Sequence, residues 1–397
     1  SHSCGCRARF VGWIMGTCCS QFVKGKDYPE TPKRPVKDVS SGGGPDKPKD
    51  MGQEEKKGET AHTTGSEETK SHEQNPRPFQ VPVVDVKKSP ESKIPKAQFS
   101  LGDVKASYRL GRQLATTNFG KVNLANDSKN GEAVVVKTSA IEGKCIEDPA
   151  EEVRMLQYLQ SLWISKKRKQ DPASSSTSCY EDAHPNIVQL KGAFHQRPCY
   201  WTVLEYCGGG DAFDYVVEHK TIDEDVVRTL WRDMLVATHF MHTNGICHLD
   251  ISLENALLST DGKKMKLCDL GAARELVFID GELQPYSPDD GCPGKKSYMA
   301  PEIFAGKKFY GTKADVFSLG VCLFILLTGK PPFRFPHRSC IFYKHIADLG
   351  VKTILDHFHY NVSAEATNLL DSMLTMNYEK RLDTTAVLNH PWMRRNR

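Results

Sequence analysis

Residues 248–255 read HLDISLEN, and residues 269–271, which begin fourteen positions after Asn255, read DLG. The two stretches place two carboxylates, Asp250 and Asp269, and one amide, Asn255, within a short length of chain. An apolar stripe with the spacing of one buried helix face precedes them, formed by Leu230, Met234, Ala237 and Met241. The sequence therefore predicts a buried helix that leads into a loop rich in oxygen ligands.

These three polar groups match the demands of phosphoryl transfer. That reaction needs a carboxylate to accept the proton of the attacking hydroxyl, and a second carboxylate and an amide to hold Mg²⁺. Asp250 suits the first role, and Asp269 and Asn255 suit the second. On these residues, in this order and spacing, the chain resembles the eukaryotic protein kinases.

Three later matches, in the family's order, extend the resemblance to residue 392, and the segments described below extend it back to residue 108. They are YMAPE at 298–302, DVFSLG at 315–320, and KRL at 380–382 with HPW at 390–392. The resemblance implies that Glu302 and Arg381 form a buried ion pair and that Asp315 begins the central helix of the large lobe. The apolar residues 316–327 are too few to span a bilayer, which takes about 20, and predict a buried helix.

Residues 108–136 alternate apolar and polar positions around Asn130-Gly131, which predicts two or three antiparallel strands. The resemblance makes them the strands that cover ATP, and the residues then placed against the nucleotide are Leu114, Ala115, Phe119, Gly120 and Val122. Ala115 and Thr117 stand where the family has glycine, so the loop should cradle phosphate less closely. Taken alone, the segment is equally consistent with a plain β-hairpin.

Residues 134–137 read VVVK and resemble the strand that carries the phosphate-binding lysine. Lys137 would then hold the α- and β-phosphates, and Val135 would lie beside the adenine. A lysine that ends an apolar strand usually only reaches solvent. The role of Lys137 therefore depends on a glutamate partner.

That glutamate is expected in a helix over residues 148–159, where Val153, Leu156 and Leu159 share one face. The resemblance makes Glu152 the partner of Lys137, with Glu151 as the alternative. The hydrophilic insertion that follows, residues 161–183, is interpreted as a mobile loop.

Residues 200–211 (YWTVLEYCGGGD) predict a buried strand that ends in a glycine turn. By resemblance this is the hinge between two lobes, with Leu204 as the gatekeeper. Glu205 and Cys207 would bind the adenine edge through backbone groups, and Asp211 would meet the ribose. Leu257 completes the predicted ATP-binding set.

Three positions depart from the family near the predicted site. Leu249 replaces an arginine that receives an activation-loop phosphate, so we expect activity without that phosphate. Ser252 replaces a lysine that steadies the γ-phosphate. Lys295 stands where serine or threonine is usual, and two interpretations stay open. It reaches back as the missing cation, or it is a surface lysine that contacts acidic substrate residues or nothing.

The predicted function is an ATP- and Mg²⁺-dependent protein kinase that transfers the γ-phosphate to serine or threonine of protein substrates. Ser252, Ala115 and Thr117 argue for an alternative, a pseudokinase scaffold with weak or no catalysis. A kinase of small molecules is a third possibility, against which residues 300–302 argue. The altered loops resemble divergent protist kinases such as those of apicomplexan parasites.

The predicted fold is α+β and two-lobed, with a β-rich N-lobe at about 108–205 that carries one helix and a helical C-lobe at about 206–392. Residues 15–100 are expected to be a disordered tether, because Lys, Glu, Gly, Ser, Pro and Thr dominate their composition. A net charge of +4 marks no nucleic-acid partner. Thirteen cysteines without a secretory signal favour reduced thiols in the cytosol. The sequence carries no signal for the oligomeric state.

Residues 15–20 (MGTCCS) have the form of an N-myristoylation site at Gly16, with Cys18 and Cys19 available for palmitoylation. Two acyl groups would anchor the chain to the cytoplasmic face of a membrane. Residues 1–14 are then a leader of open status, with Met15 as the true start. The alternative is a chance hexapeptide in a disordered tail of a cytoplasmic protein.

Overall fold

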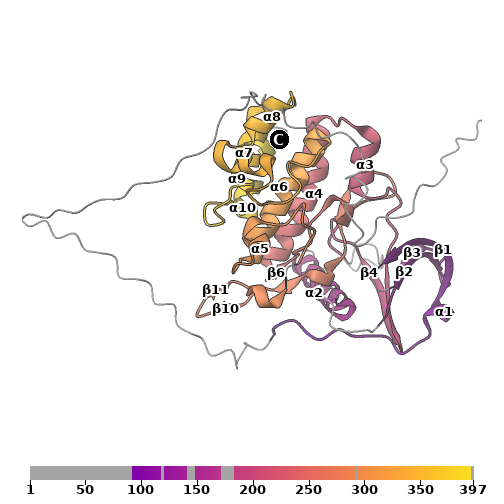
Figure 1. The fold of residues 1–397 in the computed structure, drawn as a ribbon. Helices are drawn as coiled ribbons and strands as arrows, with labels where there is room; N and C mark the ends of the chain where they lie inside the picture. The colour runs from indigo at the N-terminus through magenta and orange to yellow at the C-terminus, as the bar shows by residue number, and fades with distance from the viewer. Residues whose placement is uncertain (1–91, 118–119, 141–147, 171–182, 292, 395–397) are drawn as a thin grey trace, which may run out of the picture. The chain divides into compact units, whose positions relative to one another are not determined.

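The computed structural model describes residues 92–117, 120–140, 148–170, 183–291 and 293–394. Within them, a sheet-rich part comes first along the chain and a helical part follows (Figure 1). The change from sheet to helices occurs after strand β5. This arrangement confirms the predicted two-lobed α+β fold.

The N-lobe is built on one antiparallel sheet with the strand order β1-β2-β3-β5-β4. Its strands are β1 (Tyr108–Thr117), β2 (Gly120–Asp127), β3 (Ala133–Ala140), β4 (Leu190–Gln196) and β5 (Cys199–Glu205), and a short helix, α1 (Val104–Ser107), precedes them. The β2–β3 hairpin turns through Gly131, whose φ of +74° is one that glycine adopts freely. Gly120 allows a close approach instead, because a Cβ there would lie 1.7 Å from the carbonyl oxygen of Thr138.

Helix α2 (Pro149–Gln170) is longer than the sequence predicted. Residues 161–170, expected to begin a mobile loop, continue the helix, so this part of the prediction is wrong. No glycine or proline interrupts residues 150–170, and Lys, Arg and Gln are good helix formers. The rest of the expected loop, residues 171–182, lies outside the described residues.

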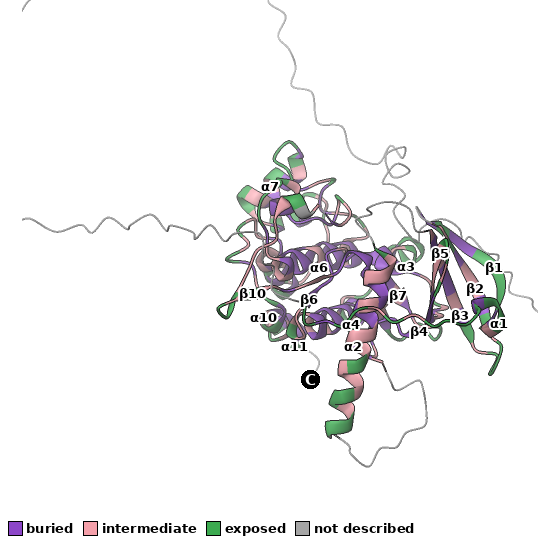
Figure 2. Ribbon diagram, turned by 90° about the horizontal axis from the view of Figure 1, so that it is seen from below, coloured by how far each residue is buried: buried purple, intermediate pink, exposed green. Residues whose placement is uncertain are grey.

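The second half of α2 also has a partner in the C-lobe. The Trp163 ring packs edge-on against His184 and Phe240, with ring centroids 4.7 and 5.6 Å away. Beyond this contact the basic residues 166–169 are largely exposed, and the far end of α2 is green in Figure 2. The helix therefore joins both lobes near its middle and ends in solvent.

Residues 92–100, here called the N-terminal strap, pack against α2. Ile94 is 5% exposed, and its carbonyl accepts a 3.2 Å hydrogen bond from Arg154. Gln98 and Gln157 exchange two hydrogen bonds, of 2.9 and 2.7 Å. The strap falls inside the stretch predicted to be disordered, because its few apolar residues are diluted by polar neighbours in the composition.

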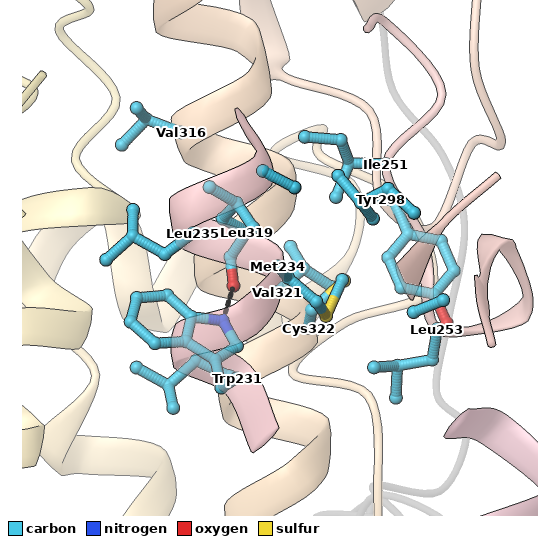
Figure 3. Packing of buried hydrophobic residues seen from close by; sticks show 14 of the residues in the cluster. Trp231, Met234, Leu235, Ile251, Leu253, Tyr298, Val316, Leu319, Val321 and Cys322 are labelled. Carbon is cyan, nitrogen blue, oxygen red and sulfur yellow. Dashed lines mark hydrogen bonds between the residues drawn. The ribbon is translucent and has the colours of Figure 1, made fainter. Parts of the chain in front are cut away.

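The C-lobe is assembled around two long helices, α4 and α6, which pack against each other. Its helices are α3 (Ala212–His219), α4 (Glu224–Thr243), α5 (Pro301–Phe304), α6 (Gly311–Thr328), α7 (Ile341–Leu349), α8 (Lys352–His357), α9 (Ala364–Met373), α10 (Thr384–Leu388) and α11 (Pro391–Arg394). Trp231 of α4 is fully buried, and its indole N–H donates to the Leu319 carbonyl at 3.0 Å (Figure 3). Ile251, Leu253 and Tyr298 lie in the same core (Figure 3).

Short strands and 3₁₀ turns fill the chain between α4 and α5, the part of the C-lobe that carries Asp250, Asn255 and Asp269. The strands are β6 (Ile246–Cys247), β7 (Ala256–Leu258), β8 (Met265–Leu267), β9 (Arg274–Glu275), β10 (Phe278–Ile279) and β11 (Glu282–Leu283). The 3₁₀ turns are η2 (Leu253–Asn255), η3 (Leu270–Ala272) and η4 (Pro288–Asp290). β6 pairs with β9, β7 with β8, and β10 with β11.

Helix α6 alone among the described helices is long and apolar enough to cross a membrane. However, 72% of its apolar window is buried inside the domain. Its apolar residues therefore serve as core, which agrees with the buried helix predicted from residues 316–327.

Arg381 and Glu302 form the buried ion pair that the resemblance implied. The guanidinium donates to both carboxylate oxygens, at 2.7 and 3.0 Å, and the two side chains are 0% and 4% exposed. Arg381 also donates to the backbone carbonyls of Lys313 and Thr375. The pair thus ties α5 to the segment before α10.

Candidate active site

Lys137 joins charged groups from three segments of the chain. It lies on β3, which is paired on one side with β2 and on the other with β5, so the strand register fixes its backbone. Its ammonium donates to Glu152 at 2.8 Å and to Asp269 at 3.2 Å. Burial alone would lower the pKa of Lys137, but Asp269 and Glu152 together raise it. Glu151, the alternative partner, pairs instead with Arg154 at 2.6 Å.

Asp269 stands between β8 and the turn η3. Its φ of 62° lies in the left-handed region, which is uncommon for a residue other than glycine. Burial alone would raise the pKa of its carboxyl, but the Lys137 ammonium holds that pKa below the usual range. Helix α2 begins against the same turn, where the Asp148 amide donates to the Gly271 carbonyl at 3.3 Å.

The catalytic loop, residues 248–255, is held by the buried carboxylate of Asp315. This carboxylate accepts hydrogen bonds of 2.8 Å from the backbone amides of His248 and Leu249. The His248 ring nitrogen Nε2 lies 3.1 Å from the Cys268 carbonyl. Asp315 therefore fixes the start of the loop, and His248 links it to the residue before Asp269.

Asp250 and Asn255 are brought together within this loop. The Asn255 amide donates to the Asp250 carbonyl at 2.8 Å and to its carboxylate at 2.7 Å. Burial raises the pKa of Asp250 to about 6, although the Lys295 ammonium opposes the shift. A carboxylate with a pKa near neutrality is well suited to accept a proton at neutral pH.

The residues predicted to contact nucleotide lie in two apolar groups. Leu114, Ala115 and Val122 form a small N-lobe cluster with Val135 packed against it. Leu204, Cys207 and Leu257 belong to the larger core cluster. Val135 and Leu204 are directly paired between β3 and β5, so the sheet joins the two groups.

Two hinge carboxylates have partners of their own. Glu205 pairs with Lys266 at 2.8 Å and accepts the Gln189 amide at 2.7 Å. Asp211 caps helix α3 by accepting the Asp214 amide at 2.8 Å, and burial raises its pKa to about 7. The adenine and ribose contacts of these residues stay predictions.

Lys295 reaches back into the catalytic loop, as one of its two interpretations required. Its ammonium donates to Ser252 Oγ at 2.7 Å and to Asn255 Oδ1 at 3.3 Å, and lies 3.9 Å from Glu254. Burial alone would lower the pKa of Lys295, but Asp250 and then Glu254 raise it. With its side chain only 25% exposed, Lys295 is not a solvated surface lysine.

The activation segment, residues 269–302, is anchored beside Leu249 without a charged group at that position. Leu249 is 5% exposed and has a φ of +64°. Tyr286 exchanges backbone hydrogen bonds with Phe309, and its hydroxyl donates to the Glu275 carbonyl at 2.8 Å. The Arg274 guanidinium lies 5.5 Å from the centre of the Tyr286 ring.

Sequence reasoning missed Gly294, which places Lys295 against the catalytic loop. Its φ is +92°, and a Cβ there would lie 2.8 Å from the Leu249 carbonyl oxygen. The Pro293-Gly294 pair, a common turn signal, could have indicated this bend. Four predicted residues lie outside the described part of the chain: Phe119, Gly16, Cys18 and Cys19.

Comparisons with known proteins agree with this geometry. A family model described as the protein kinase domain matches residues 108–393. The chain is 32% identical over 298 residues to calcium-dependent protein kinase 17 of Arabidopsis thaliana, which covers 74% of this chain and 50% of that protein. It is 29% identical over 298 residues to calcium-dependent protein kinase 26 of Oryza sativa subsp. japonica, with coverages of 74% and 49%.

A third relative, serine/threonine-protein kinase SAPK2 of Oryza sativa subsp. indica, is 28% identical over 292 residues, with coverages of 73% and 77%. The chain spans about half the length of the two calcium-dependent kinases. The likeness to protist kinases stays a prediction. The chain belongs to the eukaryotic protein kinase family.

Proposed function

We propose that the chain is an active protein kinase that transfers the γ-phosphate of ATP to serine or threonine of protein substrates. The observation that carries this proposal is the double contact of Lys137, which donates to Glu152 and Asp269 together. A kinase needs both the strand lysine paired with its helix glutamate and the metal-binding aspartate in place. The two hydrogen bonds bring these groups into one site.

Asp250 is the proposed base of the transfer. The substrate hydroxyl oxygen forms a bond to the γ-phosphorus, the bond from that phosphorus to the β–γ bridging oxygen breaks, and ADP leaves with the electron pair. The hydroxyl proton passes to the Asp250 carboxylate. The Asn255 amide donates a hydrogen bond to that carboxylate and so fixes its orientation within the loop.

Asn255 and Asp269 are the proposed ligands of Mg²⁺. Their amide and carboxylate oxygens are donors of the kind this ion prefers. When bound, Mg²⁺ neutralises charge on the β- and γ-phosphates. Lys137 would position the α- and β-phosphates from the N-lobe side, held in place by Glu152.

The test is transfer of labelled γ-phosphate from Mg-ATP to a generic basic protein, with wild type compared with Asp250→Asn. We expect transfer by the wild type and a loss of at least about a thousandfold in the variant, because the proton acceptor is removed. Asp356→Asn, on an exposed carboxylate of α8, is the matched control and should keep full activity.

The competing pseudokinase function makes the opposite prediction. Ser252 removes a charge, and Ala115 and Thr117 remove two glycines, from positions where active kinases of the family use them. No transfer by a folded wild type, together with weak binding of Mg-ATP, would overturn the proposed activity and favour a scaffold. Equal transfer by wild type and Asp250→Asn would overturn the role of Asp250.

We also propose that acylation of Gly16, Cys18 and Cys19 holds the kinase at the cytoplasmic face of a membrane. The support is the sequence pattern MGTCCS, since these residues lie outside the described part of the chain. Intact-mass measurement of the protein from its native cells should find a terminal, myristoylated Gly16. A mass that includes residues 1–14 and no acyl group would contradict the anchor.

A further inference from the structure

The catalytic loop and the activation segment have exchanged a lysine and a small hydroxyl residue. In the family pattern the loop carries the lysine and the segment carries serine or threonine, whereas here the loop has Ser252 and the segment has Lys295. The structure brings the exchanged residues into contact, with Lys295 Nζ 2.7 Å from Ser252 Oγ. A contact between a lysine and a hydroxyl residue is therefore present, with the lysine on the activation segment and the hydroxyl on the catalytic loop.

The backbone around Lys295 is fixed on both sides. Gly294, with its φ of +92°, bends the chain so closely that a Cβ would lie 2.8 Å from the Leu249 carbonyl oxygen. On the other side, the Lys295 carbonyl accepts hydrogen bonds from the amides of Tyr298 and Met299, at 2.9 and 3.0 Å. Tyr298 in turn is tied to α6, because its carbonyl accepts a 2.9 Å bond from Ser318.

The side chain extends from this fixed backbone to the acidic side of the site. Its ammonium also contacts Asn255 Oδ1 at 3.3 Å, and Asn255 donates to the Asp250 carboxylate at 2.7 Å. A second acidic oxygen, Glu254 Oε2, is buried without a hydrogen-bond partner among the described residues and lies 3.9 Å from the same ammonium. The charge of Lys295 is thus placed one side chain away from the proposed base.

We propose that Lys295 is a catalytic residue, whose ammonium supplies the positive charge toward the transferred phosphoryl group that Ser252 cannot supply. This inference rests on the proposed kinase activity and adds to it a residue from the activation segment. A cation aimed at charge that develops in the transition state lowers the barrier more than it improves ground-state binding. Lys295 should therefore act mainly on kcat.

The central variants separate charge from packing. Lys295→Gln keeps a hydrogen-bond donor on a side chain one bond shorter but removes the charge, and we expect kcat to fall about a hundredfold with KM for ATP changed less than about threefold. Lys295→Arg keeps the charge and should retain at least about a tenth of the wild-type kcat. Lys296→Ala, one position along and exposed, is the matched control and should be unchanged.

The decisive variant restores the family arrangement. Ser252→Lys combined with Lys295→Thr returns the lysine to the loop, and we expect it to recover at least about tenfold of the kcat lost in Lys295→Thr alone. If this double variant does not fold, Lys295→Gln and Lys295→Arg still decide the question. Full kcat in Lys295→Gln would overturn the proposal.

A binding measurement tests the same charge without turnover. The probe is Mg-ADP with aluminium fluoride, which occupies the place of the transferred phosphoryl group, compared with Mg-ADP alone, by calorimetry. We expect Lys295→Gln to weaken the fluoride-dependent part of the affinity at least about tenfold and to leave Mg-ADP binding unchanged. An equal loss for both ligands would overturn the proposal in favour of a purely structural lysine.

The two levels of failure are distinguishable. A wild type that transfers no phosphate sinks the proposed kinase activity, while the aluminium fluoride measurement still tests Lys295. A wild type that transfers phosphate with full activity in Lys295→Gln sinks only the role of Lys295.

Discussion

Two lysines reach the same acidic site from different elements. Lys137 comes from the centre of β3, where paired strands on both sides fix its backbone, and it holds Glu152 and Asp269. Lys295 comes from the activation segment, where a glycine bend and two backbone hydrogen bonds hold it, and it reaches Ser252 and Asn255.

The difference between them lies in what each position depends on. Lys137 is set by sheet register, so it is present whenever the N-lobe is folded. Lys295 is set by the activation segment, so its charge is in place only when that segment is packed against the catalytic loop. The two charges therefore depend on different parts of the fold, Lys137 on the sheet and Lys295 on the packing of the activation segment.

Arg381 is a buried cation outside the site, so its removal shows how much stability a purely structural charge provides. Arg381→Met would leave the Glu302 carboxylate buried and unpaired, and we expect a loss of about 3–5 kcal/mol in the free energy of unfolding. Urea denaturation measures it, and adding Glu302→Leu should restore part of the loss. If Lys295→Gln cost as much stability as Arg381→Met, the comparison between the two lysines would fail.

Lys137→Met tests the member of the pair that the sheet positions. We expect phosphate transfer to fall by about 10²–10³-fold, or about 2.7–4 kcal/mol, because an ammonium that positions phosphate is lost. The measurement is single-turnover transfer from Mg-ATP. Lys129→Met, in the exposed β2–β3 turn, is the control and should keep normal rates.

Lys137 and Lys295 also differ in how closely a glutamate approaches each ammonium. Glu152 is within hydrogen-bond distance of Lys137 at 2.8 Å, whereas Glu254 lies 3.9 Å from Lys295. We expect Glu152→Gln to lower kcat/KM by about tenfold, or about 1.4 kcal/mol, and Glu254→Gln to lower it by less than about threefold. Steady-state kinetics measures both losses. A larger loss in Glu254→Gln than in Glu152→Gln would show that Lys295 depends on Glu254.

Only weak effects are expected from two changes where the activation segment is anchored. Tyr286→Phe removes one hydroxyl bond to the Glu275 carbonyl but keeps the ring beside Phe309, and Ser287→Ala removes a phosphorylatable hydroxyl. We expect each to change the rate by less than about tenfold, because the buried Leu249 offers no charge for a phosphate. A larger loss in Ser287→Ala, measured on protein free of phosphate, would contradict this expectation.

Much of the geometry followed from short motifs in the sequence. The groups at 248–255 and 269–271 indicated which carboxylates and which amide meet, because their roles depend on local spacing. The partner of Lys137 was also predicted, with Glu152 preferred over Glu151. The buried pair of Glu302 and Arg381 was expected from matches at both ends of the C-lobe.

The rest depended on contacts that spacing does not encode. Lys295 and Ser252 are 43 residues apart, and only the bend at Gly294 brings them into reach, so both interpretations of Lys295 stood. The extension of α2 does not follow from composition, because its polar residues favour a loop. Packing of Trp163 against Phe240 of the C-lobe, which the sequence does not encode, supports the extra turns. The strap was missed because the buried Ile94 sits among polar residues.

The strap connects helix α2 with the activation segment. Arg154 of α2 is tied to the strap at the Ile94 carbonyl and is also paired with Glu275 of the activation segment at 3.2 Å. Glu152 lies two residues before it on the same helix. The contacts of the strap with Arg154 and Gln157 therefore help to hold the helix that carries the partner of Lys137.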